Sequence, residues 1–194
     1  DPGGLLAEVE RQLARWPKHR MAEDLSQRYA GWLRAFAALA SGRAALAREH
    51  VAELERGELI RRALTPHALR AEIELLRGLI HVAAPALQRE RVQRSIARLE
   101  ADPRPYGGAF AHTLRAALAL RAGRSATHAL AAAELAARRG GLSALAASAS
   151  AMQALVSSQS LGGPDGRMFL RAQGVVHPER FARFWFAPWT LEQR

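Results

Sequence analysis

Two segments of this chain have nearly the same sequence, although they begin 81 residues apart: residues 33–45 (LRAFAALASGRAA) and residues 114–126 (LRAALALRAGRSA). Eight of the thirteen positions are identical, including a Gly-Arg pair at Gly42-Arg43 and Gly123-Arg124. The spacing is about twice 40 residues, and stacked helical hairpins repeat every 34 to 47 residues or so. The repeat therefore predicts an all-α fold of stacked antiparallel helical hairpins, with these two segments forming the first and third.

The composition agrees with a helical protein of ordinary globular character. Alanine, leucine, arginine and glutamate, which are strong helix formers, make up much of the chain, and alanine alone occurs 42 times. Hydrophobic residues account for 49% of the 194 positions and charged residues for 24%, which is enough for one domain with a core. We expect residues 1–194 to form a single helical-repeat domain, a fragment of a longer protein, with residues 162–194 as a C-terminal capping segment.

Apolar spacing and breaker residues set the expected helix boundaries. Thr65-Pro66 predicts a helix start, because threonine caps well and proline suits the first helical turn. Residues 102–108 contain two prolines and two glycines and predict a linker. Four aromatic residues between 181 and 186 are expected to cover the open end of the stack. The expected helices cover 5–15, 21–40, 44–58, 66–83, 86–101, 109–121, 125–139, 142–160, 165–173 and the residues after Pro178.

The formal net charge of +10 raises a hypothesis of nucleic-acid binding, because a basic surface attracts phosphates. However, 27 of the 28 basic residues are arginine, the single lysine is Lys18, and they are spread along the chain. An excess of arginine together with alanine is also expected from a GC-rich genome. Nucleic acid is therefore kept as the alternative partner, behind a protein or peptide. In that alternative the chain is a nucleic-acid-associated helical domain of a transcriptional or ATPase regulator.

No residue pattern predicts catalysis, a metal site or a cofactor. The chain has no cysteine, and no two of its seven histidines have the i, i+3 or i, i+4 spacing common in helical metal sites. Glu72 and Glu74 are two residues apart and cannot share a helix face. The glycine-rich loop at residues 162–167 lacks the lysine of a phosphate-binding loop. We therefore expect a non-enzyme without cofactors, and the absence of long apolar stretches predicts no membrane span.

Seven residues are the candidate contacts with a partner. Arginine binds carboxylates and phosphates through paired donors, and tryptophan is enriched at the centres of interfaces. A structural role is the alternative for each, namely solvated helix ends for the arginines and burial in the capping segment for the tryptophans. The candidates are Arg28 and Arg34 in the first hairpin, then Arg124, Arg138, Arg139, Trp185 and Trp189.

Residues 105–188 also carry a pattern of short motifs, of which Leu161-Gly-Gly-Pro-Asp-Gly-Arg167 and Gln173-Gly-Val175, followed by Pro178-Glu-Arg180, are the most specific. This pattern resembles the tetratricopeptide-like (TPR-like) C-terminal region of large bacterial, notably myxobacterial, serine/threonine protein kinases. Residues 1–104 match only in period, the kinase motifs are absent, and the tail after Phe184 is more aromatic and longer than the pattern. The resemblance implies a TPR-like right-handed solenoid in a cytoplasmic bacterial signalling protein, binding a protein or peptide such as the parent kinase domain.

Overall fold

The computed structural model describes residues 2–15, 20–56, 67–157 and 166–191. These residues form ten α-helices and one short 3₁₀ helix, with no β-strand in the described ranges, so the predicted all-α class is confirmed. The elements are α1 (Pro2–Ala14), α2 (Arg20–Ala40), α3 (Ala44–Arg56), α5 (His67–Ala83), α6 (Arg89–Glu100), α7 (Pro105–Arg121), α8 (Thr127–Arg139), α9 (Ser143–Ser157), α10 (Gly166–Ala172), α11 (Pro178–Phe186) and η1 (Pro188–Leu191).

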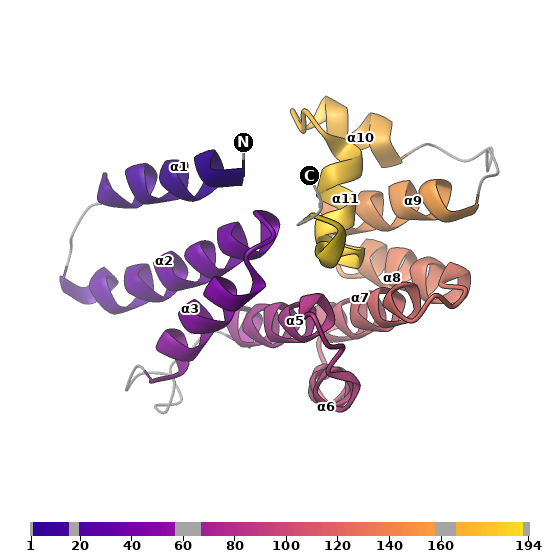
Figure 1. Cartoon of the computed structure of the whole chain (residues 1–194), viewed down its shortest axis with the longest axis horizontal. Helices are drawn as coiled ribbons and strands as arrows, with labels where there is room; N and C mark the ends of the chain where they lie inside the picture. Colours follow the sequence, from indigo (N-terminus) through magenta and orange to yellow (C-terminus); the bar gives the residue numbers. More distant parts are fainter. Residues whose placement is uncertain (1, 16–19, 57–66, 158–165, 192–194) are drawn as a thin grey trace.

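Helices that are neighbours in sequence pack against one another. Among these sequence neighbours, the most extensive contacts join α7 to α8, α8 to α9, α2 to α3, and α5 to α6, and α9 packs as extensively on α11. Figure 1 shows that the chain from α2 to α9 follows a curve, and that α11 lies on the inner side of this curve. No helix in the described ranges is long and apolar enough to cross a bilayer.

The repeated sequence segments form the same corner in the structure. Gly42 and Gly123 have φ values of 75° and 64°, in the left-handed region that favours glycine. After each glycine, the arginine N–H donates to a carbonyl five residues earlier, at 2.8 Å for Arg43 to Ala38 and 2.9 Å for Arg124 to Ala119. This is the hydrogen bond of a Schellman helix end, in which a glycine lets the chain reverse after the last turn.

Gly123 allows a direct test of this corner. We expect Gly123→Ala to lower the free energy of unfolding by about 1 kcal/mol, because an L-residue is strained at positive φ. Gly108, inside α7, has open space where a Cβ would lie, so Gly108→Ala should be neutral or stabilising by up to about 1 kcal/mol. Urea unfolding of both variants checks the pair, and equal effects of the same sign would contradict the assigned corner.

A second feature repeats between the two segments, this time through side chains. Arg34 of α2 binds Glu10 of the preceding helix through two hydrogen bonds, of 2.6 Å from Nε and 2.9 Å from Nη2. Arg115 holds the equivalent position in α7 and pairs with Glu100 of α6, the helix that precedes it. The arginine of the shared Leu-Arg-Ala sequence thus ties each helix to the one before it.

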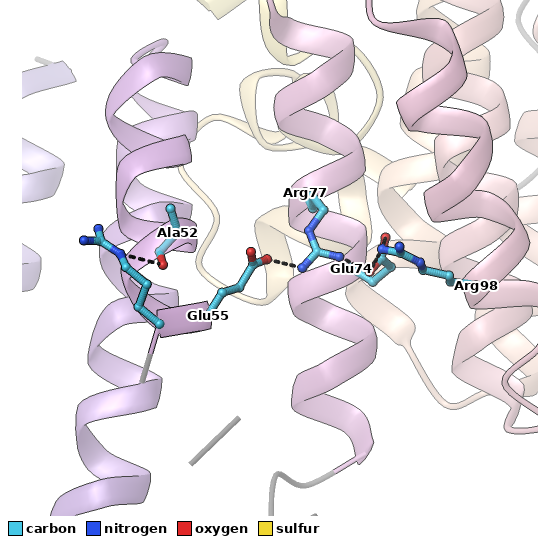
Figure 2. A network of polar contacts seen from close by, with 6 residues as sticks. Ala52, Glu55, Glu74, Arg77 and Arg98 are labelled. Carbon is cyan, nitrogen blue, oxygen red and sulfur yellow. Dashed lines mark hydrogen bonds and ion pairs between the residues drawn. The ribbon is translucent and has the colours of Figure 1, made fainter. Parts of the chain in front are cut away.

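A network of charges joins the middle of the stack. Figure 2 shows Arg77 of α5 between Glu55 of α3 and Glu74 of its own helix, with Arg98 of α6 on the far side of Glu74. The Nη1 atom of Arg98 lies 3.4 Å from the nearer Glu74 oxygen. The two carboxylates and the two guanidinium groups balance in charge, and they link α3, α5 and α6. We therefore assign this network a structural role.

The predicted linker at residues 102–108 is shorter in the structure, because α7 already begins at Pro105. Proline is favoured in the first turn of a helix, and Gly107 lets that turn approach α6 closely. A Cβ at position 107 would lie 2.6 Å from the carbonyl oxygen of Leu99. The predicted helix start at Thr65-Pro66 and residues 162–165 of the predicted glycine-rich loop lie outside the described residues.

The aromatic residues of α11 contact more than the end of the stack. Helix α11 packs mainly on α9 and α7, and the η1 turn that follows it reaches α5 and α2. The rings of Phe184 and Phe36 are 4.1 Å apart between centroids, which joins α11 to the first predicted hairpin. The C-terminal segment therefore covers part of the inner side of the curve.

Candidate functional site

A cavity of about 410 Å³ lies where α11 faces α2 and α5, with α7 and the start of α9 completing its walls. Its volume falls within the range of small-molecule pockets in proteins. Most of the lining is apolar, and it contains five aromatic side chains: Trp32, Phe36, Phe110, Phe184 and Trp185. The cavity depends on the position of α11, since Phe184 and Trp185 of this helix form part of its wall.

The aromatic rings on two sides of the cavity form one connected cluster. Phe36 contacts Trp32 on its own helix, with centroids 5.3 Å apart, and Trp185 across the cavity wall, at 5.8 Å. Phe184 and Trp185 meet edge to face at 4.8 Å. Such tilted and edge-to-face contacts suit the charge distribution of aromatic rings, so the cluster holds the wall in place.

Among the described residues, Glu72 is the only charged one that lines the cavity. It lies on α5 in one helical stripe with Leu75, Leu76 and Leu79, which follow it by three, four and seven positions and line the same cavity. Glu74, two residues further along, belongs to the ion network on another face of the helix. Within the described ranges, Glu72 has no ion pair and no side-chain hydrogen bond. Burial raises the pKa of the Glu72 carboxyl above its ordinary value of 4.5.

Because the pKa of Glu72 is raised, its contribution to the free energy of unfolding should depend on pH. Ionisation of Glu72 costs more in the folded protein than in the unfolded chain, so its penalty is absent below the ordinary pKa of 4.5 and grows as the pH rises. We expect Glu72→Gln to match the wild type near pH 4 and to be more stable at pH 7, by on the order of 1 kcal/mol. Thermal melts across this range measure the difference, and a pH-independent difference would contradict it.

Four of the predicted partner contacts lie in α2 and in the C-terminal segment formed by α11 and η1. Trp185 is half-buried in the aromatic cluster, and its buried Nε1 atom has no hydrogen-bond acceptor among the described residues. Arg34 is engaged with Glu10, which raises the pKa of the guanidinium and lowers that of the carboxyl, chiefly through their hydrogen bonds. Arg28 and Trp189 lie in α2 and η1, but their side chains are not among the described ones.

The other three predicted contacts surround α8. Arg124 lies before its first turn, whereas Arg138 and Arg139 lie in its last turn, so about 18 Å of helix separates the two ends. Arg138 binds Glu134 on its own helix, at 2.7 Å from Nη2. Arg124 and Arg139 are exposed. A single partner could reach both of these arginines only through an extended segment.

Sequence reasoning did not select Glu72 or the cavity. A signal existed, because Glu72 is the one acid in a helical stripe that is otherwise leucine, and an acid on an apolar face is unusual. No group of three acidic or histidine side chains that could hold a metal ion occurs among the residues the structure describes. No family model matches this chain, and neither a curated protein nor a solved structure is significantly similar to it.

Proposed function

We propose that this chain is a non-catalytic protein-interaction and regulatory domain of a bacterial signalling protein, of the serine/threonine kinase type. In this proposal its helices form a TPR-like right-handed solenoid, which offers an extended surface to a protein or peptide. The parent kinase domain is one such partner. A kinase-linked domain of this kind acts in the cytoplasm, by recruiting a partner or by restraining the enzyme.

The repeated corner is the observation that supports this proposal most strongly. Segments 33–45 and 114–126 share their sequence, their positive-φ glycine and the same hydrogen bond after it. Each also pairs its arginine with the helix before it. Repeated hairpins of this kind stack into extended surfaces, which proteins use more often for binding than for chemistry.

Arg124 and Arg139 are the predicted contacts best placed to meet a partner. Both are exposed, and neither has an ion-pair partner among the described residues. Because guanidinium groups bind carboxylates well, an acidic peptide that runs along α8 could engage both ends of the helix. Arg34 and Trp185 are already occupied by contacts within the chain, and we assign them a smaller part in binding.

The test is an affinity capture from bacterial lysate with the wild-type domain and two charge-reversal variants as bait. The double variant Arg124→Glu/Arg139→Glu changes the proposed surface, and Arg171→Glu on exposed α10 serves as the control. We expect a protein that survives nuclease and high salt with the wild type and the control, and that is lost with the double variant. Capture that ignores both changes, or no capture at all, would reject the proposed surface.

Nucleic-acid binding is the second candidate, and the exposed side of α6 is the observation that favours it. Arg89, Arg91 and Arg94 are exposed on this helix, and Arg98 follows one turn later. Binding to phosphates weakens steeply as salt rises, because counterions are released. If the capture recovers only material that nuclease removes, and Arg91→Glu/Arg94→Glu abolishes it, nucleic acid becomes the first candidate.

A further inference from the structure

The cavity between α2, α5 and α11 combines two features that single out a class of ligand. Its walls are aromatic and aliphatic, and the carboxyl of Glu72 is the single charged group among the described lining residues. A side chain serving only to fill the core would be apolar at this position, as Leu75, Leu76 and Leu79 of the same stripe are. A carboxylate without a partner in apolar surroundings is costly, so a cationic ligand would supply what the site lacks.

No basic side chain among the described residues pairs with the carboxyl of Glu72. Burial raises the pKa of the Glu72 carboxyl, and no arginine or histidine among the described residues forms an ion pair with it. The arginine next along α5, Arg77, points to Glu55 and Glu74 in the separate ion network of Figure 2. Among the described residues, Glu74 is thus paired with arginines, whereas Glu72 has no such partner and lines the cavity.

The aromatic walls would bind a cation as well. Trp32 of α2 and Trp185 of α11 both line the cavity, and each ring contacts Phe36, with centroids less than 6 Å apart. The faces of tryptophan and phenylalanine attract organic cations, tryptophan most strongly, and the attraction increases where water is excluded. Alkylated ammonium groups suit such a site because they are weakly hydrated and cover the rings with methyl groups.

We infer that this cavity binds an organic cation, an alkylated ammonium joined to an apolar body, with the ammonium between Glu72 and the aromatic rings and the body against the leucines of α5. The volume of about 410 Å³ accommodates a ligand larger than a simple tetraalkylammonium ion. Binding would hold α11 against α2 and α5, since all three contribute to the walls. This inference does not depend on the proposed protein partner.

The test compares three probes with similar tails and different head groups: octyltrimethylammonium, octanol and octanoate. Binding to the full chain is measured by calorimetry and by tryptophan emission, because Trp32 and Trp185 line the cavity. We expect the cation to bind at least about tenfold more tightly than octanol, and octanoate to bind more weakly than octanol.

Two variants separate the charge from the aromatic faces. Glu72→Gln should remove most of the preference for the cation while octanol binds as before, and Trp32→Leu should weaken the cation more than octanol. Glu49→Gln, at an exposed position of α3, is the matched control and should leave all affinities unchanged. Circular dichroism confirms that each variant is folded.

Several results would overturn the inference. Equal binding of the cation and octanol would show an apolar cavity without charge selection. Tightest binding of octanoate would assign the site to acids, and a cation affinity that Glu72→Gln leaves intact would place the ligand elsewhere. Absence of binding for all three probes at millimolar concentration would also reject it.

Discussion

Replacing Phe184 with alanine is expected to lower the free energy of unfolding by about 3 kcal/mol. Phe184 is only 3% exposed, and its ring contacts Phe36 of α2 as well as its neighbour Trp185. Its removal enlarges an existing cavity and deletes the contact that joins the C-terminal helix to the first hairpin. Guanidinium unfolding measures the loss.

Phe169 provides the matched control for this change. It lies on α10, 41% exposed, so Phe169→Ala should alter the free energy of unfolding by less than about 0.5 kcal/mol. Hydrogen exchange adds a local readout: Phe184→Ala should increase exchange in α11 and in the C-terminal half of α2. Similar losses from both phenylalanines, or unchanged exchange in α2, would argue against the contact between α11 and α2.

Replacing Gly166 with alanine is expected to cost about 1–3 kcal/mol, because the new methyl group has no room. A Cβ at this position would lie 2.1 Å from the carbonyl oxygen of Ala147, on the facing helix α9. The obstacle is backbone, which cannot rotate away as a side chain would. Helix α10 would have to move outward, so both the unfolding free energy and the exchange protection of α10 should fall.

The control for Gly166 is the same substitution at Gly108, where nothing lies within 4 Å of the added Cβ. Gly108→Ala should be neutral or slightly stabilising, since alanine favours the helix in which the residue lies. A neutral Gly166→Ala would contradict the close approach of α9 and α10.

Local chemistry explains why the sequence predicted the helices and corners well. The start of α3, both ends of α8 and the start of α11 lie within about two residues of the expected positions, because propensity, proline and glycine act over a few residues. The corner at Gly123 needed only a glycine that tolerates positive φ. The start of α7 was misplaced because proline and glycine were taken together as a linker, whereas Pro105 begins the helix and Gly107 packs beneath it.

The candidate site could not be predicted in the same way. Arg34 and Arg115 hold equivalent positions, and only the packing of α1 and α6 showed that each is bound to a glutamate. Glu72 and Glu74 are nearly adjacent in sequence, yet one joins an ion network and the other lines a cavity. The difference comes from the helices that face each side of α5, which a local pattern does not specify.

The sequence by itself determined an all-α chain, its breaks and its repeated glycine corners, because these follow from interactions between residues close along the backbone. Only the tertiary structure decided that α11 returns to the inner side of the curve, where Phe184 meets Phe36. An aromatic helix face predicts burial but does not name its partner. That choice depends on how hydrophobic surfaces far apart in sequence fit together, and here it created the cavity that Glu72 faces.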